Sequence, residues 1–372
     1  MKITAYEGIC NLGVGISAIY QKAINGERGD YVLAENFSSK PVLIGVINCE
    51  LPYINESRFN IRCNRLILKN LELLQNQITD LLHKYGKSKI GIICATTNSG
   101  VEEFEHTKNN KHYELGNSAE FLHNYLNLTG YYTTVSTACS SSTKAFSLAR
   151  DLINNNVVEA VIIVCADTLA KLPIYGFYSL EVLSEQISNP FSKNRSGMNI
   201  GEASSIFIIE QDGPGIEILG LGESSDIYHI TTPDPNGVEE INAIRLALKD
   251  AAIMPEDIDY INAHGTGTIA NDLMEATAIH KVFGGKIPVS STKPLTGHCL
   301  GSASGIETLL CCKLLDDFSG KLFPHIYDGE YDLGLPPIKL AEKNMIYPRC
   351  KTVLSNSFGF GGTNAIIVLR RG

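Results

Sequence analysis

The segment VSTACSSSTKAFSLARDLI, residues 135–153, decides the fold and contains the first functional candidate. An apolar strand ends in it, small residues follow, and an apolar pattern of helical period begins at once. The pattern predicts a strand, a tight turn and a helix, with Cys139 at the turn. Free N–H groups and the positive dipole end at a helix N-terminus favour a thiolate over a thiol. Cys139 is therefore a candidate nucleophile, although a lone cysteine in such a place is often a structural residue.

Three segments far downstream supply the partners that a nucleophilic thiol needs. They are NAHGTGT (262–268), STKPLTGHCLGSASGIE (291–307) and SNSFGFGGTNAIIVL (355–369). Together they carry two imidazoles, His264 and His298, and one ammonium, Lys293. Catalytic cysteines and their histidines meet in space rather than in sequence. The four segments therefore predict a single thiol–imidazole site.

Composition narrows the class of protein. The 372 residues are 44% hydrophobic and 19% charged, which is typical of a globular enzyme with one large or two medium domains. We expect no membrane span, because no run of 18 apolar residues occurs, and the N-terminus lacks the organisation of a signal peptide. The ten irregularly spaced cysteines indicate reduced thiols, which predicts a cytoplasmic location. A net charge of −9 argues against nucleic acid.

The sequence indicates two halves with the same order of strands and helices. The stretch SSSTKAFSLARDLI (140–153) is echoed by GSASGIETLLCCKLL (301–315), and each half closes on a strand. Strands that alternate with helices predict an α/β protein whose sheet is covered on both faces. The Gly- and Pro-rich segment 211–218 is the predicted crossover. We therefore place an N-terminal half, with the nucleophile, at 1–212 and a C-terminal half, with His and Lys, at 213–372.

The four motifs resemble those of the elongating β-ketoacyl-[acyl carrier protein] synthases, in the same order along nearly the whole chain. The resemblance implies the thiolase fold, a five-layer αβαβα sandwich of two pseudo-duplicated halves. It also implies a decarboxylative Claisen condensation, in which an acyl thioester on Cys139 is extended by malonyl-[acyl carrier protein]. No covalently bound cofactor and no metal are implied. The substrates would arrive on the phosphopantetheine of an acyl carrier protein.

The resemblance also assigns roles to residues. His264 and His298 would hydrogen-bond the enolate formed on decarboxylation. Lys293 would have an electrostatic role, in which it holds His298 and sets the local field without moving protons. The backbone amides of Cys139 and Phe360 would form the oxyanion hole. The other implied positions are Gly359 and Gly361 in the gate loop, Thr231, Thr266 and Thr268 for pantetheine, and Glu307 and Phe358 as support for the site.

Several features bear on the subfamily and the partners. Met198 stands where common fatty-acid elongating enzymes carry an aromatic residue, and the segments ICNLGVG, GFYSLEVLS and SGMNIGEA resemble ketosynthases of aryl polyene clusters. Some of these pair with a silent chain-length factor that lacks the cysteine. We expect a homodimer, or a heterodimer with such a factor. Arg58, Arg62, Arg65 and Lys69 form either a docking face for the carrier protein or an ordinary solvated helix face.

Two other functions fit the sequence less well. A CoA-dependent thiolase should carry a second cysteine in a C-terminal C-x-G turn, where this chain has FGFGG (358–362). A non-catalytic chain-length partner should lack the nucleophile, which this chain retains. Both alternatives are therefore disfavoured, and an initiating synthase is too, because it would lack the HGTGT and GH pair.

Overall fold

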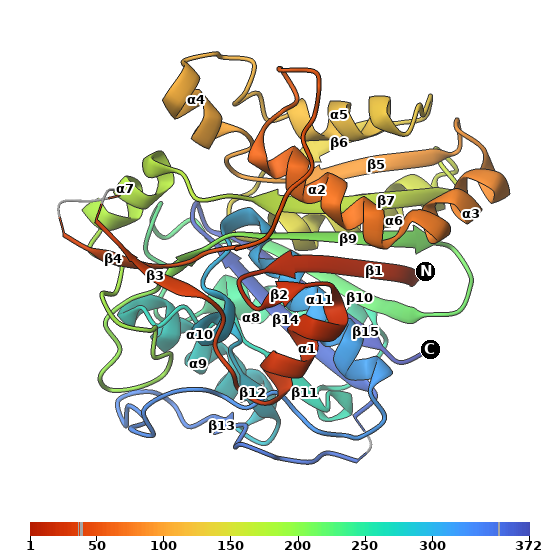
Figure 1. Cartoon of the computed structure of the whole chain (residues 1–372). Helices are drawn as coiled ribbons and strands as arrows, with labels where there is room; N and C mark the ends of the chain where they lie inside the picture. Colours follow the sequence, from red (N-terminus) through yellow and green to blue (C-terminus); the bar gives the residue numbers. More distant parts are fainter. Residues whose placement is uncertain (36, 38–39, 349) are drawn as a thin grey trace.

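The computed structural model describes residues 1–35, 37, 40–348 and 350–372 (Figure 1). Its strands are β1 (Lys2–Cys10), β2 (Gly13–Val14), β3 (Tyr31–Ala34), β4 (Val42–Gly45), β5 (Ile90–Ala95), β6 (Tyr132–Val135), β7 (Ala160–Asp167), β8 (Ile200–Gly201), β9 (Ala203–Glu210), β10 (Ile216–Ser225), β11 (Tyr260–Asn262), β12 (Pro288–Ser290), β13 (Lys339–Leu340), β14 (Thr352–Gly359) and β15 (Thr363–Arg370). Its helices are α1 (Ile16–Ile24), α2 (Arg62–Leu73), α3 (Gln75–Tyr85), α4 (Val101–Thr107), α5 (Asn117–Tyr125), α6 (Ser141–Asn154), α7 (Lys171–Ser179), α8 (Val238–Asp250), α9 (Ile269–Phe283), α10 (Lys293–Thr296) and α11 (Ala303–Asp316), with 3₁₀ turns η1 (Pro255–Asp257) and η2 (Leu300–Ser302).

Among the described residues, twelve strands form one continuous sheet whose two halves, joined where β1 pairs with β10, stack as two sheets, while β3, β4 and β8 form a separate three-stranded sheet. The order in the large sheet is β13-β12-β11-β14-β15-β10-β1-β9-β7-β5-β6, and β1 pairs with β10 at Lys2↔Glu217 and Ile3↔Ile216. Helix α6 contacts β5 and β7 on one side and β15 on the other, and α11 contacts both β9 and β14. These two helices therefore form a layer between the sheets.

Further helices cover the outer faces. Helices α2 and α5 pack on the half that contains β5, β7 and β9, and α8 packs on β10 and β15 with α9 against it (Figure 1). The predicted five-layer αβαβα sandwich is confirmed. The two helices that echo each other in the sequence, α6 and α11, contact each other in the middle layer. The predicted boundary at 212/213 lies in the turn between β9 and β10.

The central strands of the first half are buried on both faces. In the structure every residue of β9 is buried, as is every residue of β7. Helices cover both faces of this sheet, so its strands need apolar or hydrogen-bonded residues on both sides.

Strand β6 ends the sheet order and leaves one edge of the large sheet without a neighbouring strand among the described residues. Tyr131 and Tyr132 on this edge are 40% and 45% exposed. All ten cysteines are free thiols. In the part of the chain that the structure describes, no helix combines the length and the apolarity needed to cross a bilayer.

Candidate active site

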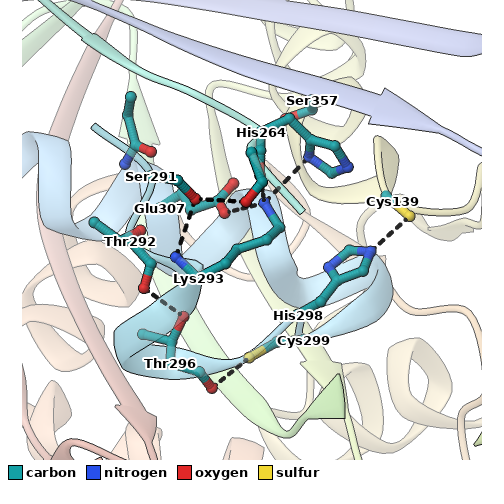
Figure 2. Close-up of polar contacts among 12 residues, drawn as sticks. Cys139, His264, Ser291, Thr292, Lys293, Thr296, His298, Cys299, Glu307 and Ser357 are labelled. Atoms are coloured by element: carbon teal, nitrogen blue, oxygen red, sulfur yellow. Dashed lines mark hydrogen bonds and ion pairs between the residues drawn. The ribbon is translucent and has the colours of Figure 1, made fainter. Parts of the chain in front are cut away.

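Cys139 lies at a strained turn between β6 and α6. Ala138 has a φ of 53°, in the left-handed region that residues with a Cβ rarely adopt. The Ser141 N–H donates to the Ala138 carbonyl (3.1 Å), and the Ser141 hydroxyl accepts from the Thr137 N–H (2.8 Å). These bonds hold the turn. The Cys139 side chain, which is 5% exposed, faces His298 (Figure 2).

His298 contacts the thiol directly. Its Nε2 lies 3.0 Å from Cys139 Sγ (Figure 2). Its backbone N–H donates to the Asn199 carbonyl (2.7 Å), and its own carbonyl accepts from the Gly201 N–H (3.0 Å). The backbone around β8 therefore positions this imidazole.

His264 lies beside His298, with ring centroids 5.3 Å apart and planes at 89°. The Lys293 Nζ lies 3.2 Å from His264 Nδ1 and 2.5 Å from the His264 carbonyl oxygen. An ammonium can only donate, so Nδ1 accepts and the ring proton resides on Nε2. His264 lines the cavity that reaches Cys139 and so offers it an N–H donor.

Both imidazoles are neutral at pH 7. Burial lowers the pKa of His264 well below its ordinary value, and Lys293 and His298 lower this pKa further. Burial also lowers the pKa of His298, again with a contribution from Lys293. Neutral rings with one N–H each can stabilise negative charge on an oxygen without giving up a proton.

The expectation of a resting thiolate is wrong. Burial raises the pKa of the Cys139 thiol to about 11, although Lys293 and the N–H groups of Phe360 and Cys139 act in the opposite direction. Desolvation exceeds the effect of the helix start because the sulfur is enclosed between the sheets. Cys139 is therefore a thiol at neutral pH, with His298 within reach of its proton.

Lys293 and Glu307 form a buried ion pair. Their side chains are each 1% exposed, and Nζ lies 2.5 Å from Oε1. Burial raises the pKa of the Glu307 carboxyl, and Lys293 opposes that shift. The Lys293 ammonium contacts His264 and Glu307, and its charge lowers the pKa of His298. That Lys293 holds His298 in place stays a prediction. Gly297, with a φ of 76°, turns the chain between Lys293 and His298.

The loop between β14 and β15 closes over the sulfur. The backbone N–H groups of Phe360 and of Cys139 itself lower the pKa of the thiol, which indicates that both donors lie near the sulfur. That they form an oxyanion hole stays a prediction. Gly361 and Gly362 have φ of 81° and 75°, and a Cβ on Gly362 would collide with the carbonyl of Asp226. The loop thus needs glycine to approach this closely, while its role in catalysis stays a prediction.

Aromatic rings flank this loop, which begins at the last residue of β14, Gly359. The Phe360 ring packs 5.4 Å from that of Phe177, and the Phe358 ring lies 6.0 Å from that of His264. Phe358 thus supports His264 from β14, as expected. Phe360 instead contacts α7, so a movement of this side chain would involve α7 as well.

A cavity of about 330 Å³ leads to Cys139, His264 and His298. It is lined by the three threonines that the sequence analysis selected: Thr231, Thr266 and Thr268. The Thr266 and Thr268 hydroxyls lie 3.0 Å apart, and the Thr231 hydroxyl lies 3.3 Å from His229 Nδ1. We call this the arm cavity, because its hydroxyls suit the amides of a long polar arm. Met198 is buried in its wall.

A second cavity, of about 520 Å³, reaches Cys139 from another direction. Its apolar lining residues include Val101, Ala138, Leu172, Pro173, Phe177, Leu180, Leu300 and Phe360. The two cavities share Cys139, Phe177, Leu180 and Phe360. The thiol therefore lies where the arm cavity, which carries the threonine hydroxyls, meets this second cavity, which we call the apolar cavity.

The sequence analysis missed two acids that shape the HGTGT turn. Glu275 accepts the N–H groups of His264 (2.7 Å) and Gly265 (2.6 Å), and Asp272 accepts that of Gly267 (3.2 Å). Both acids lie on α9 and are fully buried. Their spacing of three residues in NDLMEAT puts them on one helix face, which was the available signal.

Three of the four basic side chains of the possible docking face form ion pairs. Arg62 pairs with the buried Glu202, Arg58 with Glu120, and Lys69 with Glu72, while Arg65 donates to the Pro52 carbonyl. Of the two readings left open by the sequence, these contacts favour an ordinary helix face held by local ion pairs.

Cys139, His264 and His298 also have the donor types of a metal site, since their donor atoms lie within 4.8 Å of one another. The ammonium of Lys293, 3.2 Å from His264, opposes a second cation at this place. That the protein uses no metal stays a prediction.

Alkylation of Cys139 by iodoacetamide should be slow at pH 7 and rise about tenfold per pH unit toward pH 10. The reason is the raised pKa, about 11, which makes the reactive thiolate a minor form that grows with pH throughout this window. Mass spectrometry of the Cys139 peptide measures the rate, with Cys139→Ala as background. A plateau reached at or below pH 7 would contradict the buried thiol.

Replacing Lys293 by Met should lower the free energy of unfolding by about 3–5 kcal/mol, because Glu307 is then buried without its counter-charge. Adding Glu307→Gln should recover part of that loss. Denaturant titration measures both, and Lys193→Met, which breaks the exposed Lys193–Glu330 pair, is the control expected to change little. Equal losses in the single and double variants would argue against a stabilising ion pair.

Comparisons with known proteins cover most of the chain. The β-ketoacyl synthase N-terminal domain model matches residues 93–213, and the C-terminal domain model matches residues 216–324. A 3-oxoacyl-[acyl-carrier-protein] synthase 2 of Coxiella burnetii is 37% identical over 265 residues, which is 66% of this chain and 63% of that protein. One from Staphylococcus aureus is 35% identical over 256 residues, or 63% and 60%. The matches thus span less than two thirds of these curated relatives.

Solved structures resemble the whole chain. The ketosynthase ApeO, solved with its chain length factor ApeC from Xenorhabdus doucetiae, has a TM-score of 0.93 and 36% identity over 99% of this chain and 97% of that one. A β-ketoacyl synthase from Burkholderia phymatum has a TM-score of 0.90 at 22% identity over 100% of both chains, which supports the thiolase fold alone. Family models match both halves of this protein, and the chain belongs to the β-ketoacyl synthase family.

Proposed function

We propose that this protein is a β-ketoacyl-[acyl carrier protein] synthase, an acyltransferase that joins an acyl thioester to a malonyl thioester. The observation that carries the proposal is the meeting of two cavities at Cys139, with two neutral imidazoles beside the thiol. One cavity suits the arm that delivers substrates, and the other suits an acyl chain.

The first step transfers the acyl group. The Cys139 sulfur attacks the thioester carbonyl carbon, the carbon–sulfur bond to the carrier breaks, and the thiol proton goes to the departing sulfur, so that the carrier leaves as a free thiol. The oxygen of the tetrahedral intermediate receives the N–H groups of Cys139 and Phe360. The acyl chain would then occupy the apolar cavity, where it would pack against the buried Leu300 and the partly buried Phe177.

The second step forms the carbon–carbon bond. The malonyl carboxylate leaves as CO₂, and its bonding electrons become an enolate whose oxygen is stabilised by the N–H donors of His264 and His298. The enolate carbon attacks the acyl carbonyl on Cys139, and collapse of the intermediate expels the Cys139 sulfur, which takes up one proton. The product is a 3-oxoacyl thioester, and no redox cofactor is needed.

Partners and pathway form part of the proposal. The substrates arrive on the phosphopantetheine of an acyl carrier protein, and an acyl-carrier protein is present in a solved ketosynthase complex that matches this fold at 23% identity. The likeness to ApeO, solved with a chain length factor, supports a polyketide or aryl polyene pathway over ordinary fatty acid synthesis. The ten free thiols suit a reducing cytoplasm.

The alternatives have less support. A thiolase needs a second catalytic cysteine, and the described residues lining the two cavities include Cys139 alone of that type. Cys299, next to His298, is fully buried, and its sulfur contacts the Thr296 and Gly297 carbonyls. A silent chain-length partner would have no use for a thiol in contact with an imidazole.

His298→Ala should retain acyl transfer to Cys139 while condensation falls about a hundredfold, because one preset donor to the enolate is lost. Cys139→Ala should lose the acyl label altogether. Mass analysis of the protein after incubation with an acyl thioester measures transfer, and CO₂-coupled product formation measures condensation. Cys49→Ala is the matched control and should keep both. Labelling of Cys139→Ala at the wild-type level would overturn the proposal.

Dimerisation through β6 is a further part of the proposal. The open edge of β6, with Tyr131 and Tyr132 partly exposed, suits pairing with a second copy or with a chain-length factor. Light scattering of the chain alone should give a dimer, and Tyr132→Lys, which sets like charges on the paired edge, should shift it toward monomer. A wild-type monomer with full condensing activity would contradict this arrangement.

A further inference from the structure

A group of exposed apolar side chains surrounds the mouth of the arm cavity. Ile227 is 95% exposed, Ile230 72%, Ile269 68% and Tyr228 59%. Ile230 and Ile269 line the cavity itself, and Ile227 and Tyr228 belong to the same loop as Ile230. We call these four residues the apolar rim. Side chains this apolar and this exposed, gathered at one opening, are typical of a contact surface.

The rim is presented by a fixed loop. The Asp226 carboxylate accepts the N–H groups of Tyr228 (2.7 Å) and Asp234 (2.9 Å), and the Asp226 N–H donates to the Gly362 carbonyl (2.8 Å). The Gly361 N–H donates to the Ile230 carbonyl (2.8 Å). The loop is thus tied to itself and to the glycine loop over Cys139, so its apolar side chains are held outward by the backbone.

Among the described residues, the charged side chains that line the arm cavity are acidic: Glu181, Asp226 and Glu240. None of the described residues that line the arm cavity is a lysine or an arginine, whereas Glu181 lies exposed among them. The basic side chains at 58–69 are occupied by their own partners, as shown above. The lining of this opening therefore offers no basic side chain to attract an acidic carrier protein.

We propose that the apolar rim is the docking surface for the acyl carrier protein, and that it binds an apolar, weakly charged face beside the serine that bears the arm. The inference rests on the proposed function. The arm that brings a thioester to Cys139 passes through the arm cavity, while the folded carrier protein stays outside at the mouth. The carrier therefore covers the residues that surround the mouth. Here those residues are isoleucines and a tyrosine, so apolar burial supplies the affinity.

The test compares two malonyl donors that differ in the carrier alone. One is malonyl-pantetheine, and the other is the malonyl-loaded type II acyl carrier protein that gives the wild type its highest turnover. The variant is Ile227→Ser, chosen because Ile227 does not line the cavity. Phe318→Ser, 79% exposed at the end of α11, is the matched control.

With the carrier-bound donor, Ile227→Ser should raise KM about tenfold and leave kcat unchanged, because the isoleucine side chain that the bound carrier would bury is lost. With malonyl-pantetheine, neither constant should change. Raising the salt from about 0.05 to 0.5 M should leave the wild-type KM for the carrier within about twofold, because apolar contacts are not screened. Phe318→Ser should match the wild type throughout.

Three results would overturn the inference: no change for Ile227→Ser with either donor, equal loss with both donors, or a wild-type KM that rises more than tenfold with salt. A change in the oligomeric state of Ile227→Ser would assign the rim to a subunit interface instead. If the wild type condensed neither donor, the proposed function would fail. Calorimetric titration of the carrier against wild type and Ile227→Ser would then still test the docking surface.

Discussion

The buried contact between Lys293 and Glu307 is the interaction on which the site depends. Two opposite charges, each 1% exposed, lie 2.5 Å apart beneath the active site. The pair lets a permanent cation sit beside His264, where it fixes the tautomer through Nδ1. The cost of removing the two charges from water is offset by their close approach and by the His264 carbonyl, which takes a further ammonium hydrogen.

The position of the site between two sheets explains its protonation states. Burial raises the pKa of the thiol and lowers that of both imidazoles, so all three groups are neutral before substrate arrives. A neutral site suits chemistry in which negative charge develops twice, first on a tetrahedral oxygen and then on an enolate. Donors preset in a dry cavity stabilise such charge more strongly than water does.

The glycine loop connects the site to its surroundings. It carries the Phe360 N–H over the sulfur, packs the Phe360 ring on Phe177 of α7, and is hydrogen-bonded to the loop that presents the apolar rim. Both cavities therefore share one wall, to which Phe360 of this loop contributes. Substrate entry and acyl storage are linked through this wall.

The sequence by itself determined the helix after Cys139, the duplicated plan and the residues that meet at the thiol, because each is encoded by a local period or by a compact motif. It did not determine the thiol's protonation state, the contact between the Lys293 ammonium and His264, or the roles of Glu275 and Asp272. Those depend on desolvation and on distances between segments that only the packed sheets bring together. The ion pairs of the basic side chains at 58–69 and the exposed isoleucines at the mouth were decided in the same way, since exposure and ion pairing are properties of neighbours in space.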